Sequence, residues 1–365
     1  MIWMNIFTIK LKTMAKINPN FIEDLNKYGA VDTNACYNCG HCTAVCSLST
    51  EEESFPREMV RYSVLGLEED IKTSLKPWLC YYCGECSDTC PRQAFPGELM
   101  MTLRRWLTTQ YDWTGLSRLL YKNLFATITF LLLIAVGVLM FGWWKQFDVE
   151  EVMYFGHYFE KIAIGSVFAI ILLPNIIRMW YFSIVKTGIK VKFRTYLSSF
   201  KELIIHMFTQ KRTLGCDDSR TRWLQHLILV IGYLSLLFTT VVLDWFGTNS
   251  KFIIYLGYIQ SAVVFIVTFI FMYERMKKVK QVSAHSHHSD WFFVIWLFLM
   301  GLTAFFVRVF IDSNLISNNV WIYLIHLIIL VQWALVIVPF GKWTHFMYRS
   351  FAMFFNDVIA NKTSK

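Results

Sequence analysis

Two cysteine-rich stretches decide how the first part of the chain folds. They are "CYNCGHCTAVC" at residues 36–46 and "CYYCGECSDTCP" at residues 80–91. Both have the spacing C-x2-C-x2-C-x3-C, in which one tight loop presents three thiolates to a single cluster, with Gly40 or Gly84 inside the loop. Zinc sites usually take two C-x2-C pairs from separate turns, and disulfides do not persist in a reducing cytoplasm. The spacing therefore predicts two iron–sulfur clusters.

The fourth cysteine of each run completes the other cluster in ferredoxins that hold two [4Fe–4S] clusters. One predicted ligand set is Cys36, Cys39, Cys42 and Cys90, and the other is Cys80, Cys83, Cys86 and Cys46. The ninth cysteine, Cys216, has no place in either set, and we expect it to be an ordinary reduced thiol.

The residues between the two runs predict helices. Ser54 and Pro56 can start a helix over "PREMVRYSVL" that Gly66 ends, and a shorter helix is expected over residues 68–75. Residues 15–110 are thus predicted to form an α-helical ferredoxin-like domain. We expect residues 1–14 to be an N-terminal extension without a cleavable signal peptide.

The rest of the chain, residues 111–365, is predicted to be a membrane domain. The chain has 365 residues, of which 55% are hydrophobic and only 17% charged. Apolar stretches long enough to cross a hydrocarbon core of about 30 Å lie near residues 119–144, 161–185, 223–246, 252–273, 291–311 and 320–343. The expected fold is mainly α, a ferredoxin-like domain followed by a bundle of six transmembrane helices.

The net charge of +9 indicates orientation rather than nucleic-acid binding. Lysines and arginines concentrate in the connections 186–222 and 274–290, whereas the connection 145–160 is acidic. Positively charged connections stay in the cytoplasm. The ferredoxin-like domain and the C-terminus are therefore expected on the cytoplasmic side of the inner membrane.

Histidines inside a membrane are rare and are treated as functional. His326 and His345 lie near opposite ends of the last span, about 28 Å apart along a helix, and so cannot bind one haem. His226 has the same depth as His345, and only His157 lies within reach of His326. We expect a haem b at His226 and His345. A second haem at His326 and His157 is open, and with one haem His326 could contact quinone.

The other histidines need no cofactor. His206 lies in an amphipathic cytoplasmic segment, where a core or surface role is expected. His285, His287 and His288 form "HSHHS", which indicates a solvated loop.

Three longer stretches carry a resemblance to known families. The two cysteine runs, with "FPREMVRYSVLG" between them, resemble the C subunit of heterodisulfide reductase, an α-helical ferredoxin with two [4Fe–4S] clusters. The stretches "RWLQHLILVIGYLSLLFTT" and "YLIHLIILVQWALVIVPFGKWTHFMYRS" resemble b-haem membrane subunits related to nitrate reductase gamma and heterodisulfide reductase E. Their fusion in this order is similar to the C subunit of the quinone-interacting membrane-bound oxidoreductase complex.

The resemblance implies which histidines bind haem. His226, His345 and His326 match haem-ligand positions, but the partner of His326 in the nitrate reductase relatives falls on Leu236 here.

The resemblance also implies the function. The chain would be an electron-transfer subunit, not a complete enzyme, and would pass electrons between menaquinol and two flavoproteins related to heterodisulfide reductase A. Those electrons would serve adenylylsulfate reductase in dissimilatory sulfur metabolism. Two alternatives are the membrane arm of a heterodisulfide-reductase-like or other respiratory reductase complex, and a zinc-bearing membrane anchor without a redox role. No nucleotide-binding motif is visible in the sequence.

Overall fold

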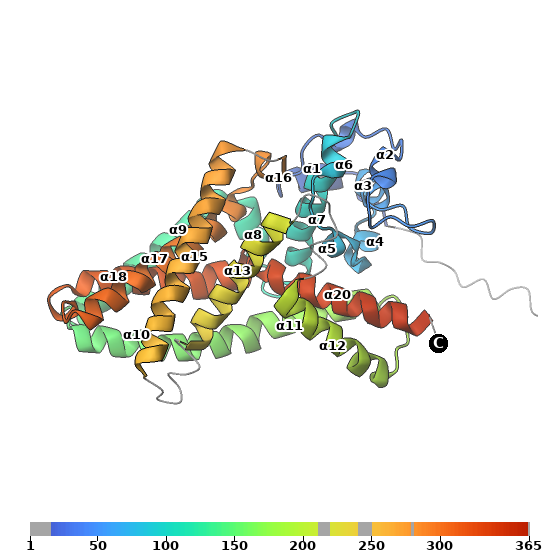
Figure 1. Cartoon of the computed structure of the whole chain (residues 1–365). Helices are drawn as coiled ribbons and strands as arrows, with labels where there is room; N and C mark the ends of the chain where they lie inside the picture. The colour runs from blue at the N-terminus through green and yellow to red at the C-terminus, as the bar shows by residue number, and fades with distance from the viewer. Residues whose placement is uncertain (1–15, 211–219, 240–249, 279–280, 364–365) are drawn as a thin grey trace, which may run out of the picture.

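The computed structural model describes residues 16–210, 220–239, 250–278 and 281–363. Over these ranges the chain is helical and has no β-strand, which confirms the predicted mainly α fold. Figure 1 shows the short helices of the first hundred residues, drawn in blue to cyan, packed at one end of a set of long helices. The N-terminal extension and Cys216 lie outside the described residues.

The N-terminal domain, called the head below, consists of short helices around one long helix. These helices are α1 (Phe21–Asn26), η1 (Thr33–Ala35), α2 (His41–Ala44), α3 (Arg57–Val64), α4 (Glu68–Thr73), α5 (Lys76–Leu79), α6 (Glu85–Asp88) and α7 (Pro96–Tyr111). The helices predicted between the cysteine runs are present as α3 and α4. Gly66 follows α3 with a φ of 69°, a left-handed conformation that glycine adopts without strain.

The helix α7 ties the head to the long helices. Fifteen of its sixteen residues are buried. At its end Tyr111 contacts Trp78 of the head and Tyr348 of the last long helix, with ring centroids 6.3 Å and 5.3 Å apart. These three aromatic side chains belong to one continuous hydrophobic core, so the head packs directly against the long helices.

Five helices of the described residues are long and apolar enough to cross a membrane. They are α9 (Leu124–Trp144), the continuous helix Val149–Val185, α15 (Lys251–Lys277), α17 (His288–Asp312) and the span Val320–Asn361, which a turn at residues 341–343 interrupts. The second consists of α10 (Val149–Val167), η2 (Phe168–Leu172), α11 (Leu173–Trp180) and η3 (Tyr181–Val185). The last consists of α18 (Val320–Gln332), η7 (Trp333–Ile337), α19 (Val338–Phe340) and α20 (Thr344–Thr363).

The remaining helices connect or flank these five. They are α8 (Leu116–Lys122), α12 (Phe193–Thr209), α13 (Arg220–Leu237), α16 (Gln281–Ala284) and η6 (Ile316–Asn318). The predicted span 223–246 begins on α13, and its last part, from residue 240, lies outside the described residues. The predicted span 223–246 is therefore not among the five membrane-length helices of the described residues.

The second long helix begins twelve residues earlier than the predicted start at residue 161. Asp148 caps it by accepting a hydrogen bond from the backbone N–H of Glu151 at 3.0 Å, and Glu150 and Glu151 lie in its first turn. Acidic residues stabilise this end of a helix, so the acidic connection folds as helix. At about 55 Å the helix is longer than a bilayer core is thick, and its far end packs into the core of the head through Met179 and Phe182.

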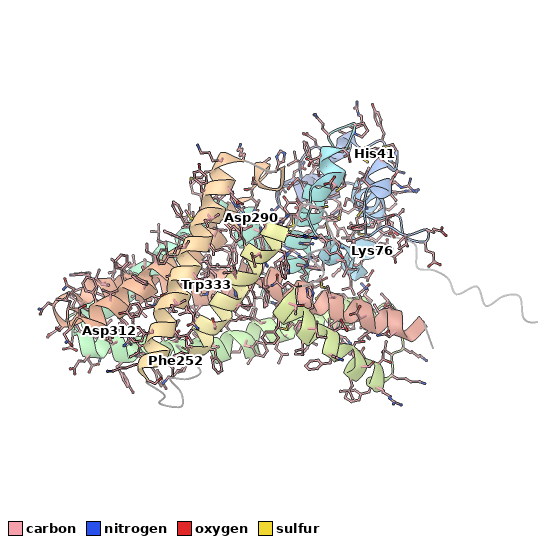
Figure 2. All side chains as sticks on the ribbon, viewed as in Figure 1. His41, Lys76, Phe252, Asp290, Asp312 and Trp333 are labelled. Atoms are coloured by element: carbon pink, nitrogen blue, oxygen red, sulfur yellow. The ribbon has the colours of Figure 1, made fainter. Side chains whose placement is uncertain are left out.

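A buried ion cluster joins the head to the long helices. Asp290, at the start of α17, pairs with Arg105 of α7 at 2.9 Å, with Lys342 at 2.7 Å and with Arg275 of α15 at 3.9 Å. The side chains of Asp290 and Arg105 are 5% and 8% exposed. Figure 2 shows Asp290 at the head end of α17 and Asp312 at the opposite end. One carboxylate is thus the shared partner of three cations, where α7, α15, α17 and the turn before α20 meet.

Substituting Asp290 by alanine is expected to lower the free energy of unfolding by about 3–5 kcal/mol, because three buried cations lose their counter-charge. The measurement is thermal unfolding of the purified full-length protein in detergent. Asp312→Ala is the matched control, because it removes the half-exposed pair with Arg308 on the same helix and should cost less than about 1 kcal/mol. Equal losses in the two variants would contradict a structural role for the Asp290 cluster.

Candidate functional site

The two cysteine runs have the same local geometry. The sulfur of Cys36 accepts a hydrogen bond from the backbone N–H of Asn38 at 3.3 Å, and the sulfur of Cys80 accepts one from Tyr82 at 3.3 Å. Asn38 and Tyr82 have φ values of 57° and 56°. Backbone N–H groups that point at sulfur stabilise the negative charge of a thiolate cluster.

A glycine follows in each loop and starts a one-turn helix. Gly40 and Gly84 have φ values of 86° and 98°, which favour glycine, and they precede α2 and α6 directly. These two helices pack against each other. Their packing places the first run beside the second.

The fourth cysteine of each run lies with the other run. Burial raises the pKa of Cys42 to about 11, and the neighbouring charges of Cys36, Cys39 and Cys90 add to the rise. Burial also raises the pKa of Cys46, where the neighbouring thiolates are Cys80 and Cys83. Cys90 therefore lies near the first run and Cys46 near the second, and Cys86 has both Cys46 and Cys42 as charged neighbours. That these cysteines bind iron stays a prediction.

The chemistry of this thiol set fits iron–sulfur clusters. The eight described cysteines form no disulfide. Thiols that raise one another's pKa need positive charge to ionise together, and the irons of a cluster supply it. Among the described residues no three His, Cys, Asp or Glu side chains converge on a single metal ion. Cysteines that ligate different irons of one cluster lie farther apart than the ligands of one zinc ion.

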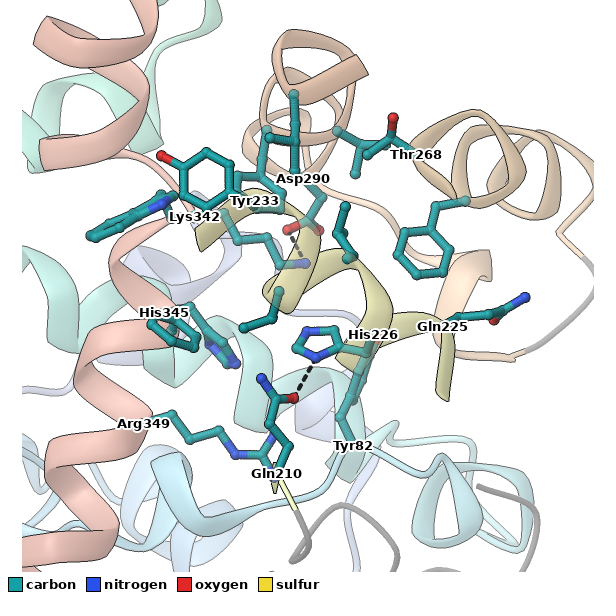
Figure 3. A pocket seen from close by; sticks show the side chains of 18 of the residues that line it. Tyr82, Gln210, Gln225, His226, Tyr233, Thr268, Asp290, Lys342, His345 and Arg349 are labelled. Carbon is teal, nitrogen blue, oxygen red and sulfur yellow. Dashed lines mark hydrogen bonds and ion pairs between the residues drawn. The ribbon is translucent and has the colours of Figure 1, made fainter. Parts of the chain in front are cut away.

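A cavity of about 300 Å³ lies between the second run and the long helices. His226 of α13 and His345 of α20 line it, as do Tyr81 and Tyr82 from the second run. Figure 3 shows the rings of His226 and His345 on either side of the same space. His226 is solvent-accessible although protein atoms surround it, because its ring faces this cavity. The structure thus brings together the two histidines predicted to bind the inner haem.

Gln210 orients the ring of His226. Its amide oxygen lies 2.5 Å from Nδ1 of His226, and Gln210 is buried. An amide oxygen can only accept, so Nδ1 carries the proton and the lone pair on Nε2 is free for a metal. Sequence reasoning missed Gln210 because it lies sixteen residues before His226 and outside any motif.

His345 has a different partner. Its Nε2 lies 3.2 Å from a guanidinium nitrogen of Arg104, which is 3% exposed. The ring also packs against Trp78, with centroids 5.8 Å apart. A metal bound through Nε2 would take the place of this hydrogen bond. The facing histidines, the apolar lining and the surrounding arginines fit a b haem, whose propionates are anionic.

Tyr82 is held at the edge of the cavity by Glu98 of α7. The Tyr82 hydroxyl donates to Glu98 at 2.5 Å, and Glu98 is 3% exposed. Burial raises the pKa of Glu98 to about 7, although the hydrogen bond from Tyr82 opposes the rise. The loop of the second run is therefore fixed from the α7 side.

The outer pair of predicted haem ligands is arranged differently. His326 on α18 hydrogen-bonds through Nδ1 to the Thr303 hydroxyl at 2.8 Å. His157 on α10 is exposed, and neither histidine lines the cavity of His226 and His345. The two helices touch where the Tyr323 hydroxyl donates to the carbonyl of Met153 at 3.3 Å, one turn from each histidine. A second haem at this depth stays a prediction.

The "HSHHS" stretch is not the solvated loop that the sequence suggests. His287 caps α17, and Nε2 of His288 lies 3.0 Å from the carbonyl oxygen of Leu120. Both side chains are half-buried because α16 and α17 fold this stretch back onto α8. His206, expected in the core or at the surface, lines the cavity.

Comparisons with known proteins agree with the cysteine geometry. Residues 35–95 match the family model of the 4Fe-4S dicluster domain. A heterodisulfide reductase C-like protein of Archaeoglobus profundus is 26% identical over 109 residues, which are 30% of this chain and 58% of that protein. The second iron–sulfur C subunit of the CoB–CoM heterodisulfide reductase of Methanocaldococcus jannaschii is 31% identical over 97 residues, 24% of this chain and 52% of that protein.

A third relative is the C subunit of the ferredoxin:CoB-CoM heterodisulfide reductase of Methanosarcina acetivorans, 31% identical over 98 residues, 27% of this chain and 38% of that protein. The chain spans about half the length of the curated relatives it matches. No solved structure matches it. Residues 35–95 of the head are therefore similar to the 4Fe–4S dicluster domain, and the head is related to the iron–sulfur C subunits of heterodisulfide reductases.

Proposed function

We propose that this chain is the membrane subunit of a quinone-interacting oxidoreductase and carries electrons between menaquinol and cytoplasmic flavoproteins. Its cofactors would be one b haem at His226 and His345 and two [4Fe–4S] clusters in the head. The observation that carries the proposal is the shared cavity, which both histidines and Tyr81 and Tyr82 of the second cysteine run line. Iron centres accept and release single electrons, which is the chemistry that such groups supply when bound.

The residues of the chain have separate roles in this proposal. Gln210 keeps the proton of His226 on Nδ1, away from the metal. Trp78 packs against the ring of His345 and fixes its plane. The ion pair between Asp290 and Lys342 also borders the cavity. Trp78 belongs to the head, and the other contacts come from the end of the proposed membrane domain that the head covers.

The orientation follows from charge. The head and α20 lie at the same end of the long helices, next to the basic connection that contains α12. Because basic connections stay in the cytoplasm, we propose that the head faces the cytoplasm, where two flavoproteins related to heterodisulfide reductase A can reach it. Adenylylsulfate reductase would be the final partner of the complex.

A second candidate keeps the electron-transfer chemistry and changes the partner. The relatives named above are subunits of heterodisulfide reductases, which favours a membrane arm of a heterodisulfide-reductase-like complex. Purification of the native complex from membranes separates the two. Flavoproteins without a cysteine-rich disulfide-reducing protein support the first candidate, and the presence of such a protein supports the second.

In the proposed ligand sets, the fourth cysteine of each run binds the cluster of the other run. This exchange predicts which cluster each single cysteine substitution removes. Cys46→Ala should remove the same cluster signal as Cys83→Ala, and Cys90→Ala the same signal as Cys39→Ala. The measurement is low-temperature EPR of the reduced full-length protein, with Cys216→Ala as the control that keeps both signals. If Cys46→Ala instead resembles Cys39→Ala, each run binds its own cluster and the exchange is wrong.

Removal of either inner histidine should remove the haem. His226→Ala and His345→Ala are expected to lose the dithionite-reduced b-type absorption bands, because both histidines would hold the haem iron. His326→Ala and His157→Ala test the second haem separately. If they lower the haem content per chain, a second haem is present, and if they leave it unchanged, the chain binds one. Full haem content in both His226→Ala and His345→Ala would contradict the predicted haem site at these two histidines.

Gln210→Leu tests the hydrogen bond to His226 without removing a ligand. Loss of such a partner typically weakens metal binding by about 10–100-fold. We expect the variant to bind haem, but to release it faster to apomyoglobin than the unaltered protein does. Gln225→Leu is the control, because Gln225 lines the same cavity without a hydrogen bond to His226. Equal release rates for both variants would contradict the role of Gln210.

A further inference from the structure

Two arginines from different domains hold the loop that starts the second cysteine run. Arg104 of α7 donates to the carbonyl oxygen of Cys80. Arg222 of α13 donates to the carbonyl oxygen of Tyr82 at 2.8 Å, and its guanidinium lies 5.9 Å from the centre of the Tyr82 ring. The loop is thus bonded both to its own domain and to a helix of the membrane domain.

A third arginine reaches the loop from the last long helix. The guanidinium of Arg349 on α20 lies 5.9 Å from the centre of the Tyr81 ring, a cation–π distance. Figure 3 shows Arg349 and Tyr82 approaching the cavity of His226 from separate elements. We call Arg104, Arg222 and Arg349 the arginine clamp.

Two of these arginines lie one helical turn from the histidines of the cavity. Arg222 precedes His226 by four residues on α13, and Arg349 follows His345 by four residues on α20. Residues four apart lie on the same face of a helix. Each helix that presents a histidine to the cavity therefore presents an arginine to the loop of the second run. The third arginine, Arg104, contacts His345 itself at 3.2 Å.

The charge of Arg104 needs an anion, and no carboxylate of the described residues is hydrogen-bonded to its guanidinium. Its partners are the carbonyls of Pro77, Trp78 and Cys80, the sulfur of Met101 and the ring of His345. A buried cation is stable only with a counter-charge. A cluster bound by Cys80 would supply this negative charge.

The first cysteine run has no such attachment to the long helices among the described residues. Its counterpart of Tyr81 is Tyr37, which is 70% exposed and packs on Arg92, 4.1 Å from the ring centre. Arg92 is itself an exposed head residue. Cys39 and its counterpart Cys83 are both exposed, but Cys80 and Cys86 are 8% and 9% exposed whereas their counterparts Cys36 and Cys42 are only partly buried. The two runs, alike in local geometry, therefore differ in burial and in their attachment to the long helices.

We propose that the arginine clamp positions the cluster of Cys80, Cys83, Cys86 and Cys46 against the His226–His345 cavity and makes it the cluster that exchanges electrons with the membrane cofactor. The cluster of Cys36, Cys39, Cys42 and Cys90 then faces the soluble partner. The exchange is a one-electron transfer without bond formation, in which one centre gains the electron that the other loses. The order of centres rests on the proposed function, whereas the electrostatic effect of the clamp on one cluster does not.

Positive charge near a cluster stabilises its reduced form, which has one more negative charge. One unit charge at roughly 10 Å and an effective dielectric constant of about 20 changes the oxidised-to-reduced ratio by about tenfold. The arginine clamp should therefore raise the midpoint potential of the second-run cluster and leave that of the first-run cluster almost unchanged.

The test is a redox titration of the full-length protein in detergent, followed by EPR. Arg222→Gln and Arg349→Gln should each lower the midpoint potential of one cluster by an amount equal to about a tenfold change in its oxidised-to-reduced ratio. That cluster should be the one lost in Cys83→Ala. Arg222→Lys keeps the charge and should restore most of the potential. Arg92→Gln, beside the first run, should leave the second-run cluster unchanged.

Iron and haem content per chain show that each variant retains its cofactors, and if one of the two glutamine variants does not, the other provides the measurement. In the variants with full haem content, the haem and the second-run cluster should equilibrate more slowly after a pulse of reductant. A shift in the midpoint potentials of both clusters, or only in that of the cluster lost in Cys39→Ala, would overturn the proposal. A cluster-specific shift in protein without haem would contradict the proposed function and leave the electrostatic part of the clamp standing.

Discussion

The burial of α7 is the constraint on which the arrangement of the head and the long helices depends. A helix with fifteen buried residues out of sixteen needs neighbours on every side, and the head supplies only some of them. The far ends of the helices Val149–Val185 and Val320–Asn361 supply the rest. These two helices are longer than a bilayer core is thick, and the surplus length is what covers α7.

Two consecutive residues of α7 connect the head to different long helices. Arg104 contacts His345 and the carbonyl of Cys80, and Arg105 pairs with Asp290. Successive residues on a helix point about 100° apart, so one turn of α7 serves both the cavity and the ion cluster. A shift of this helix would therefore move the second cysteine run and the wall of the cavity together.

Much of the site could be predicted from the sequence, because it depends on spacing along the chain. The cysteine sets follow from two identical patterns, and depth in the membrane singles out His226 and His345. The start of the helix at Val149 could not be predicted, because hydropathy penalises the acidic residues that in fact stabilise its first turn. Gln210, Arg104 and Trp78 could not be assigned either, because their contacts join segments far apart in the sequence. The four-residue spacing of Arg222 with His226, and of His345 with Arg349, was a signal that sequence reasoning could have used.

The central claim is that one chain holds two iron–sulfur clusters and a b haem side by side. Quantification of haem, non-haem iron and zinc in the purified full-length protein tests it most directly. We expect about eight non-haem irons and at least one b haem per chain, with no stoichiometric zinc. Stoichiometric zinc without haem would contradict the claim and would favour a membrane anchor without a redox role.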